Sequence, residues 1–318
     1  MSEFISSFRQ SFIVLSPSLK LVVFVIVVLL FWLFGSLLAM IIAVPAFHYE
    51  VFELLDMLTD PNREDIAVIK FLQIFQSINL FIIPSLFAAW LFSEKPAEFI
   101  FANRISSGFT ILLVLFSIIS AIPFLNYVTE LNSGLDLPAW MDKIEQKMIR
   151  MEETAAELTE LFLETNSTSD LIVNLIMVAI LPAIGEEFLF RGLIQRLLVQ
   201  WFRNGHAAII TTAFLFSFIH FQFFGFVPRF LLGLYFGYLL VWSGSIWLPV
   251  LAHLINNGLA VFYYHYAGDN AGNTTIDNIG TSDNSQYLLY VSIFITSLII
   301  GVIYLREKER SAANGNLL

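Results

Sequence analysis

The sequence predicts an all-α fold, a polytopic bundle of about eight transmembrane helices, and three observations favour it. Hydrophobic residues make up 58% of the 318 residues and charged residues only 13%, whereas soluble domains are about 45–50% apolar and about 25% charged. The apolar residues form long runs between charged loops, as in membrane-spanning helices. There are also 33 Phe residues. A soluble core could not bury this much apolar surface, so the expected solvent is the bilayer.

Each long apolar run is interpreted as one span. The first is too long for a cleaved signal peptide and is expected to be retained. The second carries Lys70 near one end, the fourth contains internal charges, and the sixth is short for a span of about 20 residues. The eight expected spans are residues 21–45, 66–92, 109–125, 171–199, 207–224, 230–242, 246–264 and 287–305.

Loop charges predict the orientation of these spans. Lys and Arg are more frequent in the loops on the N-terminal side of the membrane, and the loop before the last span has none. The positive-inside rule then places both termini in the cytoplasm, with the protein in the cell membrane. The expected segments are a cytoplasmic N-terminus (1–20), three transmembrane helices (21–125), an extracytoplasmic helix (126–170), a transmembrane core (171–264), an extracytoplasmic loop (265–286), a last transmembrane helix (287–305) and a cytoplasmic tail (306–318), disordered from Glu307.

The segment 126–170 contains the pattern of an amphipathic helix outside the membrane. Apolar residues recur at alternating steps of four and three from Leu137 to Phe162, which places them on one helix face. The other face is charged, with an acidic excess that argues against docking to anionic lipid. The apolar face suits docking on the protein's own helices or on a second copy, which would form a homo-oligomer. The helix would either cover apolar surface or act as a lid that guides substrate.

The fourth expected span carries two acids and an arginine in an apolar helix. A charge near the bilayer centre costs about 2.5–3.5 kcal/mol on insertion scales, so such residues usually have a function. Glu187 and Arg191 are four residues apart and can form an ion pair, and a pair that only fixes helix packing is an equally good explanation of these two. Glu186 points about 100° away around the helix and suits a general base. Gly185 and Gly192 allow close helix approach.

The fifth and seventh expected spans each contain a histidine. Phe216 and His220 are four residues apart and share one face, and so do His253 and Asn257. Taken singly, each His is explained by packing and Asn257 by hydrogen bonds between helices. Together with Glu186 they can form a water-activating site. In such a site a carboxylate and one imidazole take a proton from water, while a second imidazole and an amide stabilise the oxyanion.

These motifs resemble those of the CPBP family (CAAX proteases and bacteriocin-processing enzymes), intramembrane endopeptidases similar to type II CAAX prenyl proteases. In chain order the motifs are Glu186-Glu187-x-x-x-Arg191, Phe216-x-x-x-His220 and His253-x-x-x-Asn257. The resemblance covers about 171–264, so that segment is expected to be the catalytic core. It implies that the protein hydrolyses a peptide bond in a membrane-associated or lipidated protein or peptide.

The resemblance also implies a role for each motif residue. Glu186 would activate the water with help from His220. His253 and Asn257 would form the oxyanion hole. Glu187 would belong to the catalytic set, with Arg191 and Phe216 supporting it.

The sequence is compatible with a site that uses no metal and with a zinc site. The chain has no Cys, which excludes disulfides and Cys-ligated zinc. Glu186, His220 and His253 can supply a three-ligand zinc site with an open water position, and Glu187 would then be the base. There is no His-Glu-x-x-His motif, in which two histidines share a helix face. We favour a glutamate and histidine site without a metal, with zinc as the alternative.

Two other functions fit the same residues. Intramembrane Glu, His and Arg also form proton relays in ion- or proton-coupled transporters, although we find no paired half of the kind many transporters have. A non-catalytic membrane scaffold is the third possibility. The net charge of −10 argues against a nucleic-acid partner. The expected partners are membrane lipid and a membrane-associated protein or peptide substrate.

Overall fold

A computed structural model describes residues 2–59, 65–135, 137–163, 167–267, 279–282 and 284–313. Within these ranges every regular element is a helix, so the all-α prediction is confirmed. The chain forms two compact units, each built from two separate stretches of sequence. Unit 1 comprises Met1–Asn103 and Asn166–Ala208, and unit 2 comprises Arg104–Thr165 and Ile209–Leu318.

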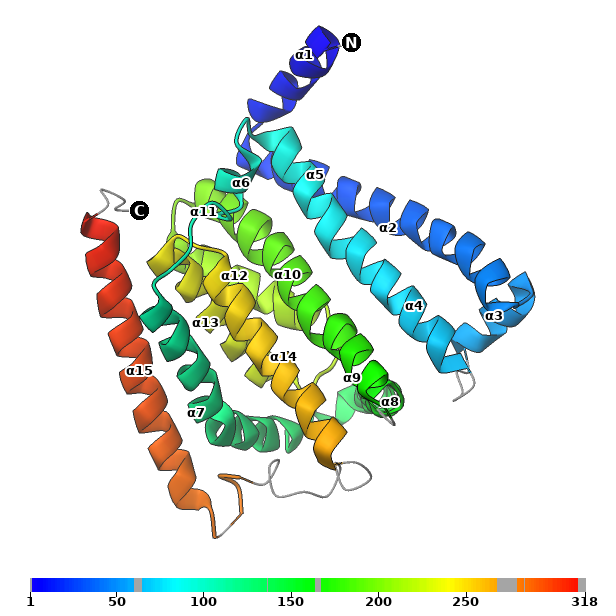
Figure 1. Ribbon diagram of the computed structural model, residues 1–318. Coiled ribbons are helices and arrows are strands. Elements are labelled where there is room, and N and C mark those ends of the chain that lie inside the picture. The colour runs from blue at the N-terminus through cyan, green and yellow to red at the C-terminus, as the bar shows by residue number, and fades with distance from the viewer. Residues whose placement is uncertain are drawn as a thin grey trace. The chain divides into compact units, whose positions relative to one another are not determined.

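Unit 1 consists of two helical stretches packed side by side. The label η marks π-helical and 3-10 segments throughout. The elements of unit 1 are α1 (Ser2–Ile13), α2 (Pro17–Phe47), α3 (Val51–Thr59), α4 (Ile66–Ser77), η2 (Ile78–Ile82), α5 (Ile83–Phe92), α6 (Pro96–Phe99), α9 (Thr168–Asn174), η4 (Leu175–Ile180), α10 (Leu181–Glu187), η5 (Phe188–Gln195) and α11 (Arg196–Phe202). Helix α2 lies along α4 and α5, and α10 lies along α4 and η2 (Figure 1). The segments η2, η4 and η5 are π-helical, a form that is frequent at functional sites.

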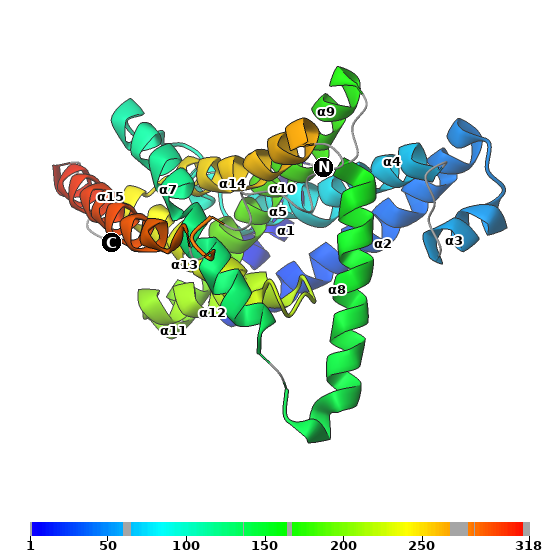
Figure 2. The ribbon, with the colours of Figure 1, turned by 90° about the horizontal axis from the view of Figure 1, so that it is seen from below.

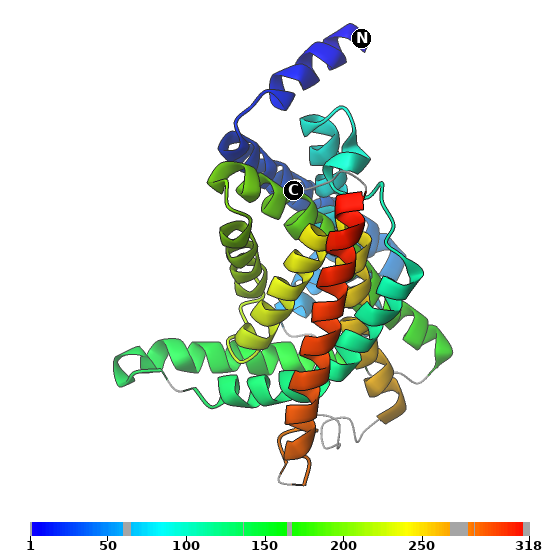
Figure 3. The ribbon, with the colours of Figure 1, turned by 90° about the vertical axis from the view of Figure 1, so that its left-hand side faces the viewer.

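Unit 2 is built around α7 and α15. Its elements are α7 (Gly108–Ser133), η3 (Ala139–Met141), α8 (Asp142–Leu163), α12 (Gly205–Phe218, from Ile209 onward), α13 (Phe226–Ser243), α14 (Trp247–Ala267) and α15 (Gln286–Ala313). Helix α15 runs beside α7 (Figure 3). The buried apolar core consists of Val114, Ile118, Phe236, Leu239, Leu248, Ala252 and Ile303.

Hydrogen bonds between side chains join the helices of unit 2. The hydroxyls of Ser117 and Tyr235 are 2.6 Å apart. Thr110 Oγ1 donates to Glu307 Oε1 at 2.6 Å, and Glu307 is only 2% exposed. Such bonds satisfy polar groups that have no water partner in lipid.

The structure supports a multi-pass membrane protein. Among the described residues, six helices are long and apolar enough to cross a bilayer: Pro17–Phe47, Ile66–Phe92, Gly108–Ser133, Thr168–Phe202, Phe226–Ser243 and Gln286–Arg310. The 14-residue α12 is apolar but shorter, and the 21-residue α14 falls outside this group. The expected count of eight spans, and the orientation of the termini, therefore stay predictions.

Large apolar side chains cover the outer faces of several of these helices. Phe34 and Ile41 of α2 are 64% and 68% exposed, and Phe294 of α15 is 70% exposed. Water would be a poor solvent for such surfaces, whereas lipid chains suit them.

The amphipathic helix predicted between the third and fourth spans is present as α8, a single long helix (Figure 2). It contacts η3 and α14 of its own unit. Part of its apolar face is covered, as at Met148, but Ile144 and Met151 are 51% and 38% exposed. Its extracytoplasmic position and its docking on a second copy stay predictions.

Two expected boundaries are wrong. The fifth span was expected to continue to residue 224, but α12 ends at Phe218. Phe221 has a left-handed backbone, with φ of 52°, which an α-helix cannot accommodate. Asn132 of α7 fixes the segment that follows, because its Nδ2 donates to Phe223 O at 2.7 Å and its Oδ1 accepts from Val227 N at 3.0 Å.

The second wrong boundary is at the C-terminus. The tail was expected to be disordered from Glu307, but α15 continues to Ala313. The buried hydrogen bond between Thr110 and Glu307 explains the extension, because it anchors the helix beyond its apolar run. Residues 268–278 and 283 of the expected extracytoplasmic loop, and 314–318 of the expected tail, lie outside the described residues.

Candidate active site

The acidic motif lies in unit 1, where α10 continues into the π-helical segment η5. The predicted ion pair is present: Arg191 Nη1 donates to Glu187 Oε1 at 2.8 Å, and both side chains are 0% exposed. The guanidinium also interacts electrostatically with Glu186, which is 9% exposed. The positive charge of Arg191 thus acts on both carboxylates, and it forms a close pair with Glu187.

Two glycines bring this helix close to its neighbours, as predicted. A Cβ at Gly185 would lie 2.7 Å from Phe81 Cβ in η2, and one at Gly192 would lie 3.2 Å from Ile100 Cβ. A contact under 3.0 Å forces a neighbour to move, so Gly185 permits an approach that a larger residue would block. This close packing keeps Arg191 and Glu187 buried.

His220 lies in unit 2, in the turn after α12 rather than on the helix itself. Its Nδ1 is 2.7 Å from the carbonyl oxygen of Phe216. Because a carbonyl oxygen only accepts, Nδ1 must carry a proton, and in the neutral imidazole Nε2 is then the nitrogen with the lone pair. This is the tautomer in which Nε2 can act as a base or bind a metal ion.

Phe216 contacts both predicted histidines. Its ring centroid is 5.2 Å from that of His220 and 5.9 Å from that of His253, both in edge-to-face geometry. Phe236 of α13 also stacks on His253, with centroids 5.4 Å apart and an interplanar angle of 22°. His253, on α14, is 4% exposed. Unit 2 therefore brings both imidazoles into contact with one phenyl ring.

Asn257 follows His253 by about one turn of α14. Its Oδ1 accepts a hydrogen bond from Nδ2 of the neighbouring Asn256 at 3.1 Å. Since the oxygen is an acceptor in that bond, any hydrogen bond from this side chain to an oxyanion would come from Asn257 Nδ2.

Each unit gathers its own part of the predicted set. Unit 1 brings Glu186, Glu187 and Arg191 together, and unit 2 brings Phe216 to both histidines. The action of the two sets in one reaction stays a prediction, which is taken up below.

A family comparison covers this region. Residues 168–259 match the family described as "Type II CAAX prenyl endopeptidase Rce1-like". This match supports the assignment of the chain to the CPBP family of CAAX-type proteases. The matched stretch contains all three motifs and draws on both units. The match supports a CAAX-type intramembrane endopeptidase in general, and such a protease would act on membrane-associated protein substrates.

No curated protein and no solved structure is similar enough to the chain to be matched. The CPBP assignment therefore depends on residues 168–259 and on the motifs within them. The first three expected spans and α8 lie outside that stretch.

Within the described residues, no three His, Asp or Glu side chains cluster as metal ligands. The proposed ligands are one carboxylate from unit 1 and two imidazoles from unit 2, and this donor chemistry suits zinc. Zinc therefore stays an untested alternative.

Sequence reasoning missed two residues that hold the motifs in place. Phe236 stacks on His253, but in the sequence it is one Phe among 33. Asn256 orients Asn257, and its position beside a motif residue was the one available signal.

Proposed function

We propose that this protein is an intramembrane endopeptidase that hydrolyses a peptide bond of a membrane-associated or lipidated protein or peptide. The observation that carries the proposal is the family match at 168–259, because it contains every motif residue at the expected spacing. We further propose that it lies in the cell membrane with both termini in the cytoplasm, as the loop charges indicate.

In the proposed reaction, Glu186 takes a proton from water, and the resulting hydroxide attacks the carbonyl carbon of the scissile bond. His220 assists through Nε2, because Nδ1 is held by the carbonyl of Phe216. The proton then passes to the leaving amine as the C–N bond breaks. This is general acid and base catalysis, which contributes about 10²–10⁴ in rate.

The negative charge that develops on the carbonyl oxygen needs hydrogen-bond donors. We assign this role to His253 and Asn257 Nδ2. His253 is held by Phe216 and Phe236, which supports a fixed donor. A fixed donor stabilises an oxyanion best, because it needs no reorganisation during the reaction.

Glu187 and Arg191 are proposed to position the helix that carries Glu186. Their pair satisfies two charges that could not otherwise stay buried in lipid. In the zinc alternative, Glu186, His220 and His253 would hold the ion, which would supply a Lewis acid and lower the pKa of its bound water. Glu187 would then be the base.

The test uses the full chain in nanodiscs with a fluorogenic, farnesylated peptide that ends in a CAAX sequence. Glu186→Ala and His220→Ala should each lose cleavage while the variants stay monodisperse and melt at the parent temperature. Matched controls are Glu160→Ala on α8 and His265→Ala at the end of α14, which should cleave at the parent rate. If Glu186→Ala and His220→Ala cleave as the parent does, the proposal is wrong.

A further inference from the structure

The end of unit 1 where α1 packs against α5 carries aromatic side chains typical of a membrane surface. Trp90 of α5 lies against α1, and at the end of α11 Trp201 and Phe202 are 55% and 39% exposed. Aromatic residues gather where membrane helices reach the headgroups. Helix α1 also exposes Phe8 by 47%, as a helix lying in that interface would.

Three cations lie at this end and form what we call the basic cluster: Arg9, Lys20 and Arg196. Each donates to backbone carbonyls. Arg9 Nε bonds to Trp90 O at 2.6 Å, and Lys20 Nζ to Ile13 O at 2.8 Å. Arg196 Nη1 bonds to the carbonyls of Glu98, at 3.0 Å, and of Phe99.

Within the part of the chain that the structure describes, the basic cluster lacks a counter-ion. Among the described residues, none of its three side chains forms an ion pair with a carboxylate. Lys20 and Arg196 are close enough to repel each other electrostatically, and Lys20 is only 8% exposed. Arg196 Nε is also buried without an acceptor. An anion placed near this end of unit 1 would reduce the repulsion between Lys20 and Arg196.

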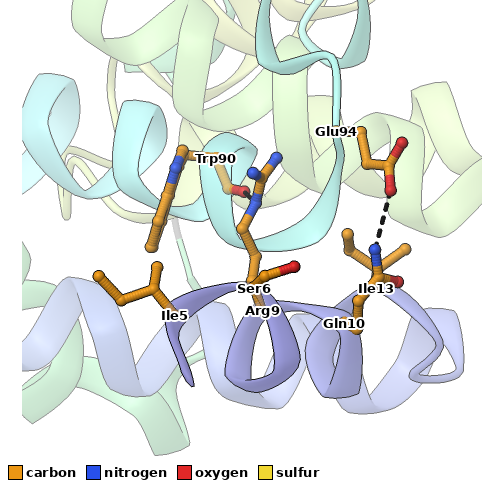
Figure 4. Close-up of a pocket in the computed structure, with 7 residues that line it drawn as sticks. All are labelled: Ile5, Ser6, Arg9, Gln10, Ile13, Trp90 and Glu94. Atoms are coloured by element: carbon orange, nitrogen blue, oxygen red, sulfur yellow. Dashed lines mark hydrogen bonds between the residues drawn. The ribbon is translucent and has the colours of Figure 1, made fainter. Parts of the chain in front are cut away.

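A pocket opens beside the basic cluster, with a volume of about 490 Å³. Figure 4 shows Arg9 at its centre, with Ile5 and Trp90 on one side and Gln10 and Glu94 on the other. Glu94 accepts a hydrogen bond from Gln10 Nε2 at 2.8 Å. The pocket is thus apolar on the Trp90 side and can donate hydrogen bonds from Ser6, Arg9 and Gln10.

The lining connects the pocket to the buried lysine. Ile13 lines the pocket, and its carbonyl oxygen is the acceptor for Lys20 Nζ. We propose that this end of unit 1 binds the headgroup of an anionic phospholipid, with the phosphate near Arg9 and the apolar lining against the start of the acyl chains. Lys and Arg beside the ends of transmembrane helices attract anionic headgroups at the membrane surface. The aromatic interface favours lipid over free phosphate, which needs no apolar wall.

The experiment measures retained lipid without any peptide substrate, so its outcome is independent of the peptidase proposal. The full chain is reconstituted with equal parts of phosphatidylglycerol and phosphatidylcholine, released from the nanodisc, and analysed by native mass spectrometry. We expect phosphatidylglycerol to be retained in preference. Arg9→Gln and Arg196→Gln should each reduce that retention about fivefold, since one cation near a membrane surface contributes about 1 kcal/mol.

The controls separate a built site from general surface charge. Lys95→Gln removes an exposed cation at the same end, one paired with Glu98 at 3.2 Å, and should leave retention unchanged. Arg9→Lys keeps the charge and should retain most of the lipid binding. This control distinguishes a loss of binding caused by the missing charge from one caused by altered packing of α1.

Three outcomes would overturn the proposal. One is equal retention of phosphatidylcholine by the parent chain, a comparison that needs no variant. Another is an equal loss in Lys95→Gln. The third is displacement of the lipid by inorganic phosphate or glycerol 3-phosphate at the same concentration, which would identify free phosphate as the ligand.

Discussion

Unit 1 and unit 2 hold their catalytic candidates by different kinds of contact. In unit 1 the carboxylates are held by charge, because Arg191 pairs with Glu187 and acts on Glu186. In unit 2 the imidazoles are held by aromatic rings, with Phe216 touching both and Phe236 stacked on His253.

The difference follows from the cost of burying charge. An ionised carboxylate in an apolar medium is very unfavourable unless an opposite charge is close. A neutral imidazole carries a smaller penalty, so a hydrogen bond such as that of His220 Nδ1 to Phe216 O, together with packing on phenyl rings, is sufficient. A membrane-embedded site can therefore hold neutral residues by shape but must hold acids by pairing.

The largest expected effect is on activity, and it distinguishes the roles of the adjacent acids Glu186 and Glu187. Glu186→Gln should lower kcat/KM by about 10²–10⁴, the contribution of a general base, with little change in the unfolding midpoint. Glu187→Gln should instead lower the midpoint, because Arg191 loses its close partner. Both are measured by peptide cleavage and by unfolding in detergent micelles. Equal loss of activity in the two variants, each fully folded, would mean that the roles of the acids are not separate.

Removing the cation tests whether charge holds unit 1 together. Arg191→Met should destabilise the protein by about 3–5 kcal/mol, because it leaves Glu187 as a buried charge without its ion pair. The double variant Glu187→Gln, Arg191→Met should regain most of that loss. The measurement is chemical unfolding of the parent, both single variants and the double variant. Additive losses in the double variant would contradict a direct pair.

Replacing an imidazole by a phenyl ring tests whether shape holds unit 2 together. His253→Phe should keep the contacts with Phe216 and Phe236 and fold normally. It should lower kcat about 10²–10³-fold, the usual cost of one oxyanion donor. His265→Phe, on the same helix, is the matched control and should cleave normally. An unfolded His253→Phe variant would show that ring contacts alone do not hold this position.

A smaller effect is expected where a hydrogen bond joins two helices of unit 2. Ser117→Ala leaves the buried Tyr235 hydroxyl without its 2.6 Å partner. The stability should fall by about 1 kcal/mol, with kcat unchanged, because neither residue belongs to the proposed site. An unfolding curve and a cleavage assay measure the two quantities. A change in kcat with unchanged stability would contradict this prediction.

The smallest effect is expected from removing metal. With the glutamate and histidine mechanism, incubation with 1,10-phenanthroline should leave the cleavage rate within about twofold of the parent, since no step of general acid and base catalysis uses an ion. The zinc alternative predicts loss of activity and its return when zinc is added. The cleavage rates with and without chelator distinguish the two mechanisms. The control variant Glu160→Ala should respond to the chelator as the parent does.

Local spacing was enough to predict several features of the fold and site. Helical periodicity predicted α8, and the four-residue spacing predicted the pair of Glu187 and Arg191. Gly185 and Gly192 marked close helix contacts in the sequence. All of these are properties of one helix and its immediate surface, which is why a single sequence carries them.

Features that depend on distant residues were not predictable. The turn at His220 is fixed partly by Asn132, which is more than eighty residues away in the sequence. The extension of α15 depends on Thr110. The π-helical segments change which backbone groups are bonded without changing the residue pattern. Apolar runs alone cannot report these long-range contacts, so boundaries set by hydropathy were wrong there.

Both units are interrupted in the sequence, and this has a consequence for biosynthesis. The ribosome makes α2, α4 and α5 first, then the opening stretch of unit 2, and only afterwards the helix with Glu186, Glu187 and Arg191. A nascent chain that stops before residue 166 therefore contains neither unit complete. Insertion must keep the early helices of unit 1 available in the translocon or bilayer until their charged partner arrives. Insertases and quality-control proteases would accordingly meet this protein as a half-assembled intermediate.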